Sequence, residues 1–182
     1  DPIGKKPLFH YLPGKNGLSV ATAGCNMEGS FCQNWNLSQF RPEQLPAEFV
    51  SPERLVQVAK ERKIPVIAHT YNEPVIFYEY VRDTGRKEIE EGIGNVIISN
   101  GFFEEKAIRE LLPSLTGVKI DLKAFTEKFY DEQCGGAELE PVLQTLRILQ
   151  ESGKWYELVV LLIPTLNDSE EEIRKLARFV AE

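Results

Sequence analysis

Two of the three cysteines in this 182-residue chain, Cys25 and Cys32, lie on one short loop. The loop follows an apolar run at residues 18–24, which predicts a β-strand. In α/β folds, ligands bind at the edge of the sheet where parallel strands end. Thiolates at that edge are suited to metal binding or to redox chemistry.

Polar residues also follow the later apolar runs, which are short and typical of strands. These strands are predicted at residues 64–68, 95–98, 118–123 and 157–163. Because parallel strands end at the same edge of a sheet, the polar residues are expected to converge with the cysteine loop. The convergent set contains two carboxylates, an amide and an ammonium, from Glu73, Asp121, Asn100 and Lys123. Such a set suits a small zwitterionic or polyol ligand.

Ordinary structural roles are the alternative for these positions. They are a helix cap for Asn72, a turn for Asn100-Gly101, a buried ion pair for Asp121 and Lys123, and helix capping for Asn167-Asp168. Cys134 precedes two glycines and is expected to pack at a helix end. His69 is expected to form hydrogen bonds at a strand end.

The strands alternate with segments of helical apolar spacing, which predicts right-handed βαβ units and a parallel sheet. Helices are expected near residues 51–62, 75–81, 104–112, 125–133, 140–151 and after 169, with a loop at 36–50. Five such units are too few for an eight-fold barrel, which takes about 250 residues. The fold class is therefore α/β, as an open sheet or a partial barrel.

Composition narrows the class of protein. The net charge of −7 gives no basic surface for a nucleic-acid backbone. No apolar run approaches the roughly 20 residues that cross a bilayer, and three cysteines do not make a disulfide framework, so a cytoplasmic protein is expected. Residues 1–17 are interpreted as a lead-in segment and residues 18–182 as one domain, which we expect to be truncated at its C-terminus.

Five short stretches together resemble a known family. Residues 22–26 (Thr-Ala-Gly-Cys-Asn) and 31–35 (Phe-Cys-Gln-Asn-Trp) resemble the cluster loop of radical S-adenosylmethionine (SAM) enzymes. Residues 68–74 (AHTYNEP), 120–125 (IDLKAF) and 162–169 (LIPTLNDS) are similar to later motifs of one group. That group is related to pyruvate formate-lyase activating enzyme and belongs to the AmmeMemoRadiSam system, alongside Memo-type proteins. The resemblance runs from about residue 8 to the end.

The resemblance implies a partial (βα)6 barrel of the TIM type. Three cysteines of a C-x3-C-x2-C loop would hold a [4Fe-4S] cluster, whose fourth iron would bind the amino and carboxylate groups of SAM. Reduction would cleave SAM to methionine and a 5′-deoxyadenosyl radical. That radical would take hydrogen from a substrate, such as a glycine of a glycyl radical protein or another partner protein.

The resemblance also implies positions for the residues of the SAM site. Tyr71, Asn72 and Glu73 would lie near the methionine amino group, and Phe31 would lie beside the cofactor. The rest of the site would be lined by polar residues of later strand ends: Ser99, Asn100, Asp121 and Lys123.

The loop departs from the family pattern at one position. Gly29 stands where the middle cysteine is required, so Cys25 and Cys32 alone cannot supply three thiolate ligands. An altered residue, a degenerate homologue without a cluster and an unusual ligand set all stay open as explanations. We expect the chain as written to bind a [4Fe-4S] cluster weakly or not at all.

Two other classes of function stay open. A cluster-less homologue would act as a SAM-binding or protein-binding module, which Gly29 favours. A non-radical α/β enzyme would use its cysteines for disulfide or zinc chemistry. The spacing of Cys25 and Cys32 is not that of a C-x-x-C motif, and a zinc site would have to draw on Cys134, His10 and His69.

Overall fold

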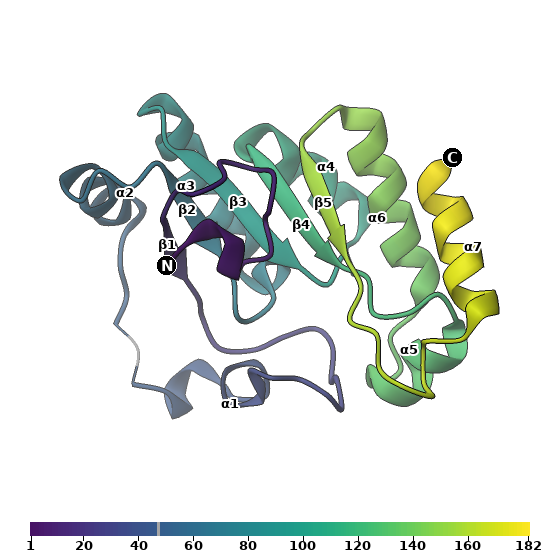
Figure 1. Ribbon diagram of the computed structural model, residues 1–182. Helices are drawn as coiled ribbons and strands as arrows, with labels where there is room; N and C mark the ends of the chain where they lie inside the picture. The colour runs from purple at the N-terminus through teal and green to yellow at the C-terminus, as the bar shows by residue number, and fades with distance from the viewer. Residues whose placement is uncertain (47) are drawn as a thin grey trace.

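Five parallel strands form one sheet, and their order in space follows their order along the chain. The computed structural model describes residues 1–46 and 48–182 (Figure 1). The strands are β1 (Gly17–Val20), β2 (Val66–His69), β3 (Gly94–Ser99), β4 (Gly117–Asp121) and β5 (Tyr156–Val159). Sequential order arises when every crossover advances in one direction, as in a barrel. The predicted α/β fold of partial-barrel type is confirmed.

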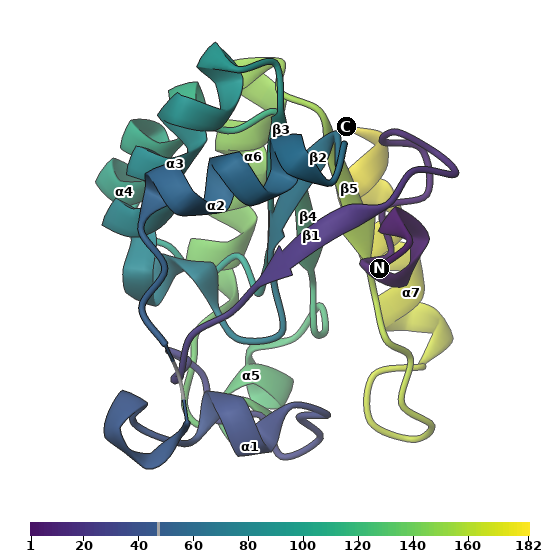
Figure 2. The ribbon, with the colours of Figure 1, turned by 90° about the vertical axis from the view of Figure 1, so that its left-hand side faces the viewer.

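One face of the sheet is covered by helices. Figure 2 shows α2 (Pro52–Glu61), α3 (Tyr78–Glu90), α4 (Glu105–Leu111) and α6 (Leu139–Ser152) on that face. Beyond the tips of the strands lie α1 (Trp35–Ser38) and α5 (Glu127–Gln133), and α7 (Glu170–Ala181) lies beside α6 (Figure 1). Short 3-10 helices complete the fold: η1 (Ile3–Lys5), η2 (Pro42–Gln44), η3 (Pro74–Phe77) and η4 (Leu112–Ser114). Among the described residues, no helix combines the length and apolar character that a membrane crossing requires.

The main core lies between the sheet and α4–α6. On α6, Val142, Leu143, Leu146 and Leu149 are buried on one face, as their spacing predicts. Gly153 ends this helix in the left-handed conformation, with a φ of 66°, which glycine adopts without strain. The strand residues opposite α6 are apolar, because the helices cover this face of the sheet.

The N-terminal segment, residues 1–17, lies across the other face of the sheet (Figures 1 and 2). Ile3 and Leu8 are buried in a small cluster with side chains of β2 and β3. The carboxylate of Glu157 on β5 accepts hydrogen bonds from three consecutive backbone N–H groups at residues 9–11, at 2.7, 3.0 and 2.9 Å. The segment is therefore packed on the sheet, while the proposed domain division at residue 17 stays a prediction.

Strand lengths differ from the prediction at both edges of the sheet. β1 ends at Val20 instead of reaching residue 24, because the backbone N–H of Thr22 donates its hydrogen bond to the side chain of Asn72. β5 ends at Val159, and the residues up to 163 leave the sheet. The buried side chain of Asn167 accepts a hydrogen bond from Ile163 and donates to the backbone of Lys123 and Leu161. The predicted capping role of Asn167 is therefore wrong, since it bonds to loop backbone.

Local signals at helix starts were mostly reliable. Ser51 caps α2 and Ser169 caps α7, each accepting a hydrogen bond from the third following N–H. The predicted capping box at α7 is only half formed, because Glu172 accepts a hydrogen bond from Phe125 N at 2.6 Å. The segment 36–50, predicted as a loop, contains most of α1 and all of η2; its residue 47 lies outside the described residues.

Candidate functional site

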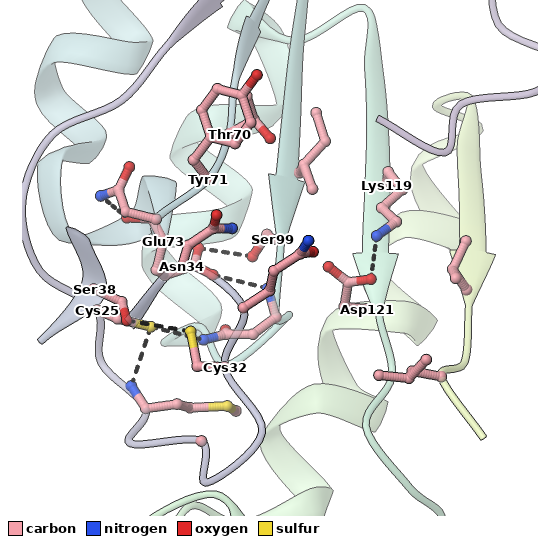
Figure 3. A pocket seen from close by; sticks show the side chains of 18 of the residues that line it. Cys25, Cys32, Asn34, Ser38, Thr70, Tyr71, Glu73, Ser99, Lys119 and Asp121 are labelled. Carbon is pink, nitrogen blue, oxygen red and sulfur yellow. Dashed lines mark hydrogen bonds and ion pairs between the residues drawn. The ribbon is translucent and has the colours of Figure 1, made fainter. Parts of the chain in front are cut away.

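A cavity of about 640 Å³ opens at the carboxyl edge of the sheet, beneath the cysteine loop (Figure 3). This volume lies within the usual range for small-molecule sites. Every site residue predicted from the sequence lines it: Cys25, Gly29, Phe31, Cys32, Tyr71, Asn72, Glu73, Ser99, Asn100, Asp121 and Lys123. The expected convergence at one edge of the sheet is therefore found, while the role of each residue stays a prediction.

Asn72, at the end of β2, holds the start of the cysteine loop. Its Oδ1 accepts a hydrogen bond from Thr22 N at 3.1 Å, and its Nδ2 donates to Gly24 O at 3.2 Å. Both bonds are made to backbone groups next to the loop, so Asn72 fixes where the loop leaves β1. The alternative role as a helix cap is wrong, because Glu73 caps η3.

The rest of the loop is held from two further sides. Asn100, after β3, donates from Nδ2 to Asn26 Oδ1 at 2.9 Å. The backbone N–H groups of Glu28 and Ser30 donate to the carbonyl oxygens of Cys134 and Gln133, at 3.3 and 2.9 Å. The loop is thus docked on the C-terminal end of α5 as well as on β2 and β3.

The two thiols of the loop are free and partly buried. Burial raises the pKa of the Cys25 thiol. A hydrogen bond from Met27 N–H at 3.4 Å lowers this pKa but does not outweigh burial. Cys32 Sγ lies 3.3 Å from Ser38 Oγ. At Gly29 there is room for a side chain, since a Cβ would lie 3.9 Å from Cys32 Cβ, but glycine itself offers no ligand.

Glu73 is buried and organises the loop after β3. Its carboxylate accepts hydrogen bonds from Ser99 Oγ at 2.8 Å, Asn100 N at 2.8 Å and Val75 N at 3.1 Å. Burial raises its pKa to about 7 despite these donors. Because internal donors occupy both oxygens, Glu73 acts here by positioning its neighbours.

Asp121 and Lys123 lie at the end of β4, with a third charged residue that sequence reasoning missed. Lys119 is 3% exposed, and its ammonium donates a hydrogen bond to Asp121, as Figure 3 shows. Lys123 Nζ lies 4.0 Å from the same carboxylate. Burial lowers the pKa of Lys119, although the attraction of the Asp121 carboxylate acts to raise it. The period-two spacing of residues 119, 121 and 123 was the available signal, because it places them on one face of a strand.

Lys6 is the second residue that sequence reasoning missed. It comes from the N-terminal segment and is 2% exposed. Its Nζ donates to Tyr71 Oη at 2.8 Å and to Asp1 Oδ2 at 3.3 Å. Tyr71 has a φ of 75°, a strained conformation for a residue with a large side chain.

Two residues considered for metal or redox chemistry have structural roles. Cys134 is 1% exposed and packs in the main core, as expected, although it also lines the cavity. His69 is fully buried against Phe77 and Tyr80, and neither ring nitrogen has a hydrogen-bond partner among the described residues. The predicted hydrogen bonding of His69 is wrong, and burial lowers its pKa to about 3. Within residues 1–46 and 48–182, no three His, Cys, Asp or Glu side chains are arranged to hold a metal ion.

Comparison with known families identifies the superfamily of this chain. The family model of the radical SAM superfamily matches residues 19–180. The chain belongs to this superfamily. An uncharacterised protein of Methanocaldococcus jannaschii, MJ0808, is 39% identical over 180 residues, which are 99% of this chain and 53% of that protein. The chain therefore spans about half the length of this curated relative.

Solved structures of radical SAM proteins share the fold. A domain of pyruvate-formate lyase-activating enzyme from Bacteroides vulgatus has a TM-score of 0.58 and 22% identity, covering 63% of this chain and 71% of that one. SuiB of Streptococcus suis bound to S-adenosylmethionine has a TM-score of 0.68 and 16% identity, covering 90% of this chain and 37% of that one. At these identities the likeness shows the fold alone.

The cluster that the radical SAM superfamily implies does not fit the residues present. The loop supplies the thiols of Cys25 and Cys32, and position 29 supplies only backbone. Cys134 lines the cavity from the core, but no three His, Cys, Asp or Glu side chains in the described part of the chain are arranged to hold a metal ion. Iron–sulfur clusters are held by thiolates, and glycine cannot take that place.

Proposed function

We propose that this radical SAM chain binds SAM in the cavity beneath the cysteine loop. The observation that carries the proposal is the convergence of every predicted site residue on one cavity. Phe31 would contact the cofactor, and Tyr71, Asn72, Glu73, Ser99 and Asn100 would shape its site. The side-chain hydrogen-bonding groups of Asn72 and Glu73 are engaged within the protein.

Direct ionic contacts to SAM are assigned to Asp121 and Lys123. SAM carries an amino group and a carboxylate, which suit a carboxylate and an ammonium of the protein. Lys123 makes no hydrogen bond through Nζ among the described residues, so its three N–H donors are available.

We further propose that the chain as written holds a [4Fe-4S] cluster weakly or not at all. Radical cleavage of SAM would require a cysteine at position 29. Gly29 therefore favours the alternative of a cluster-less, SAM-binding protein. A protein or peptide partner, including a Memo-type or glycyl radical protein, stays part of the proposal. It is supported by SuiB, which was also solved with its precursor peptide SuiA (TM-score 0.66, 16% identity, 90% and 36% coverage). The free cysteines favour a reducing compartment such as the cytoplasm.

The experiment compares the chain with Gly29→Cys and with Gly29→Ser as a matched control that adds a side chain but no thiolate. SAM affinity is measured by calorimetry, and iron content and EPR spectra after anaerobic reconstitution. We expect all three proteins to bind SAM. Only Gly29→Cys should hold about four irons and show a SAM-dependent EPR shift.

Two results would contradict these proposals separately. If none of the three proteins binds SAM, the assignment of the cavity is wrong. If the unaltered chain holds as much iron as Gly29→Cys, another residue supplies the third ligand and the cluster-less reading is wrong.

A further inference from the structure

The cavity extends from the cysteine loop to a second, charged end. Figure 3 shows Thr70 and Tyr71 on the side of Glu73 away from Cys25 and Cys32. The N-terminal segment also lines the cavity. We define the cysteine end by Cys25, Gly29 and Cys32, and the lysine end by Lys5, Lys6, Tyr71 and Lys119.

The charge of the cavity is opposite in sign to that of the chain. The chain has 28 acidic and 21 basic residues. The cavity is lined by four lysines, at positions 5, 6, 119 and 123, and by three acids, at positions 1, 73 and 121. Burial raises the pKa of Glu73 to about 7 and also lowers the pKa of Lys119, so the excess of one lysine is counted with all seven groups ionised. An acidic protein has therefore gathered an excess of lysines over acids in this cavity.

Lys119 has hydrogen-bonding capacity that the protein does not use. An ammonium has three N–H donors. The side chain is 3% exposed, and Asp121 is its single hydrogen-bond partner among residues 1–46 and 48–182. Buried charged groups normally have their donors satisfied, because unmet donors cost free energy. The remaining donors of Lys119 are therefore available to a ligand in the cavity.

Lys6 repeats this feature from the N-terminal segment. Two of its donors go to Tyr71 Oη and Asp1 Oδ2, which leaves one. The ammonium also lies 4.2 Å from the centre of the Tyr71 ring. Lys5, which is 68% exposed, adds charge at the mouth without a hydrogen bond in the described part of the chain.

We propose that the lysine end binds an anionic group, a carboxylate or a phosphate, of a second ligand that lies beside SAM. This inference rests on the proposed SAM site, because it assigns the cysteine end and Lys123 to SAM and the remaining lysines to a second ligand. Lys6 and Lys119 donate hydrogen bonds to the anion, and Lys5 attracts it. Tyr71 holds Lys6 in place.

The test titrates inorganic phosphate and succinate into the protein saturated with SAM, by calorimetry at low ionic strength. We expect at least one anion to bind, and Lys6→Gln and Lys119→Gln to weaken it by about tenfold or more. Lys5→Gln should weaken it by about two- to threefold without changing packing. Lys15→Gln, an exposed lysine of the same segment, is the matched control and should bind as the unaltered chain does.

The outcomes separate this inference from the proposed function. If SAM does not bind but an anion binds and depends on Lys6, the proposed function is wrong and the anion site stands. If SAM binds and neither anion does, or if the three cavity variants bind anions like the Lys15→Gln control, the inference is wrong. If SAM displaces the anion competitively, the lysines serve SAM itself, which also overturns it.

Discussion

At the cysteine end of the cavity, hydrogen bonds of uncharged amide and backbone groups hold the loop in place, whereas at the lysine end charged side chains hold the N-terminal segment. The cysteine loop is bonded to the ends of β2, β3 and α5. None of these docking bonds is made by position 29, whose carbonyl accepts a hydrogen bond from Cys32 N at 3.1 Å within the loop. The loop is a preformed support that lacks one ligand.

The lysine end is built differently, because the groups that hold it together are also the groups available to a ligand. Lys6 Nζ links the N-terminal segment to Tyr71, and Lys119 Nζ is bound to Asp121. A change in these side chains alters both support and recognition. At the cysteine end, different groups hold the structure and bind the ligand. At the lysine end, the same side chains do both.

The sharpest way to break the cysteine end is Gly135→Ala. Gly135 follows α5 with a φ of 72°, and a Cβ there would lie 2.7 Å from Glu28 Cβ, closer than atoms can pack. We expect the free energy of unfolding to fall by about 2–3 kcal/mol, from left-handed strain and the displaced loop together. Denaturant unfolding measures the loss, and faster labelling of Cys25 and Cys32 by a thiol reagent measures the undocking.

Gly136→Ala is the matched control. Gly136 has a φ of 79°, but an added Cβ would meet nothing within 4 Å. It should lose about 1 kcal/mol from strain alone and leave thiol labelling unchanged. Equal effects of the two substitutions would mean that docking on α5 does not hold the loop.

The sequence predicted the parts of the site that follow from strand order. Asn72, Asn100 and Asp121 come directly after apolar runs, and parallel strands place such residues at one edge. Their positions directly after predicted strands were therefore enough to place them in the cavity. Their partners were not predictable in the same way. That Asn72 bonds to Thr22 and Gly24 depends on the distance between two loops 50 residues apart.

The lysine end could not be predicted, for two physical reasons. Lys6 lies in a segment rich in Pro, Gly and Lys, which gives no periodic signal, and its burial depends on Ile3 and Leu8 packing on the sheet. Lys119 lies inside an apolar strand, where a charge is costly unless it is paired. Its spacing from Asp121 was visible in the sequence. Only the fold shows that this face of β4 lines a cavity, whereas the other face packs on helices.

Asp121→Asn tests the wall between the two ends. It leaves the Lys119 ammonium buried without a carboxylate, so we expect the free energy of unfolding to fall by about 2 kcal/mol. Lys119→Met should cost less, about 1 kcal/mol or under, because Asp121 is 31% exposed and stays hydrated near Lys123. Denaturant unfolding without ligand measures both. The reverse order would show that Lys119 is not effectively buried.

Glu157→Gln gives the smallest effect and acts on the lysine end alone. The carboxylate accepts hydrogen bonds from Phe9, His10 and Tyr11, which fix the segment that carries Lys6. Glutamine keeps one acceptor oxygen but loses the charge, so the free energy of unfolding should fall by about 1 kcal/mol at pH 7. Thiol labelling at the cysteine end should not change, in contrast with Gly135→Ala.

The pH dependence of this difference identifies the carboxylate as its cause. Burial opposes ionisation of Glu157, but the backbone donors and the indole N–H of Trp155 outweigh it and hold its pKa below the ordinary value of 4.5. A lowered pKa means that the stabilisation is complete above 4.5 and is lost as the pH falls through the folded-state pKa. The gap between the unaltered chain and Glu157→Gln should therefore shrink as the pH falls below 4.5, where the carboxylate loses its charge toward the backbone donors and toward His10 Nδ1 at 3.6 Å. A gap that persists in acid would assign the effect to packing, and charge would then not be what holds the N-terminal segment.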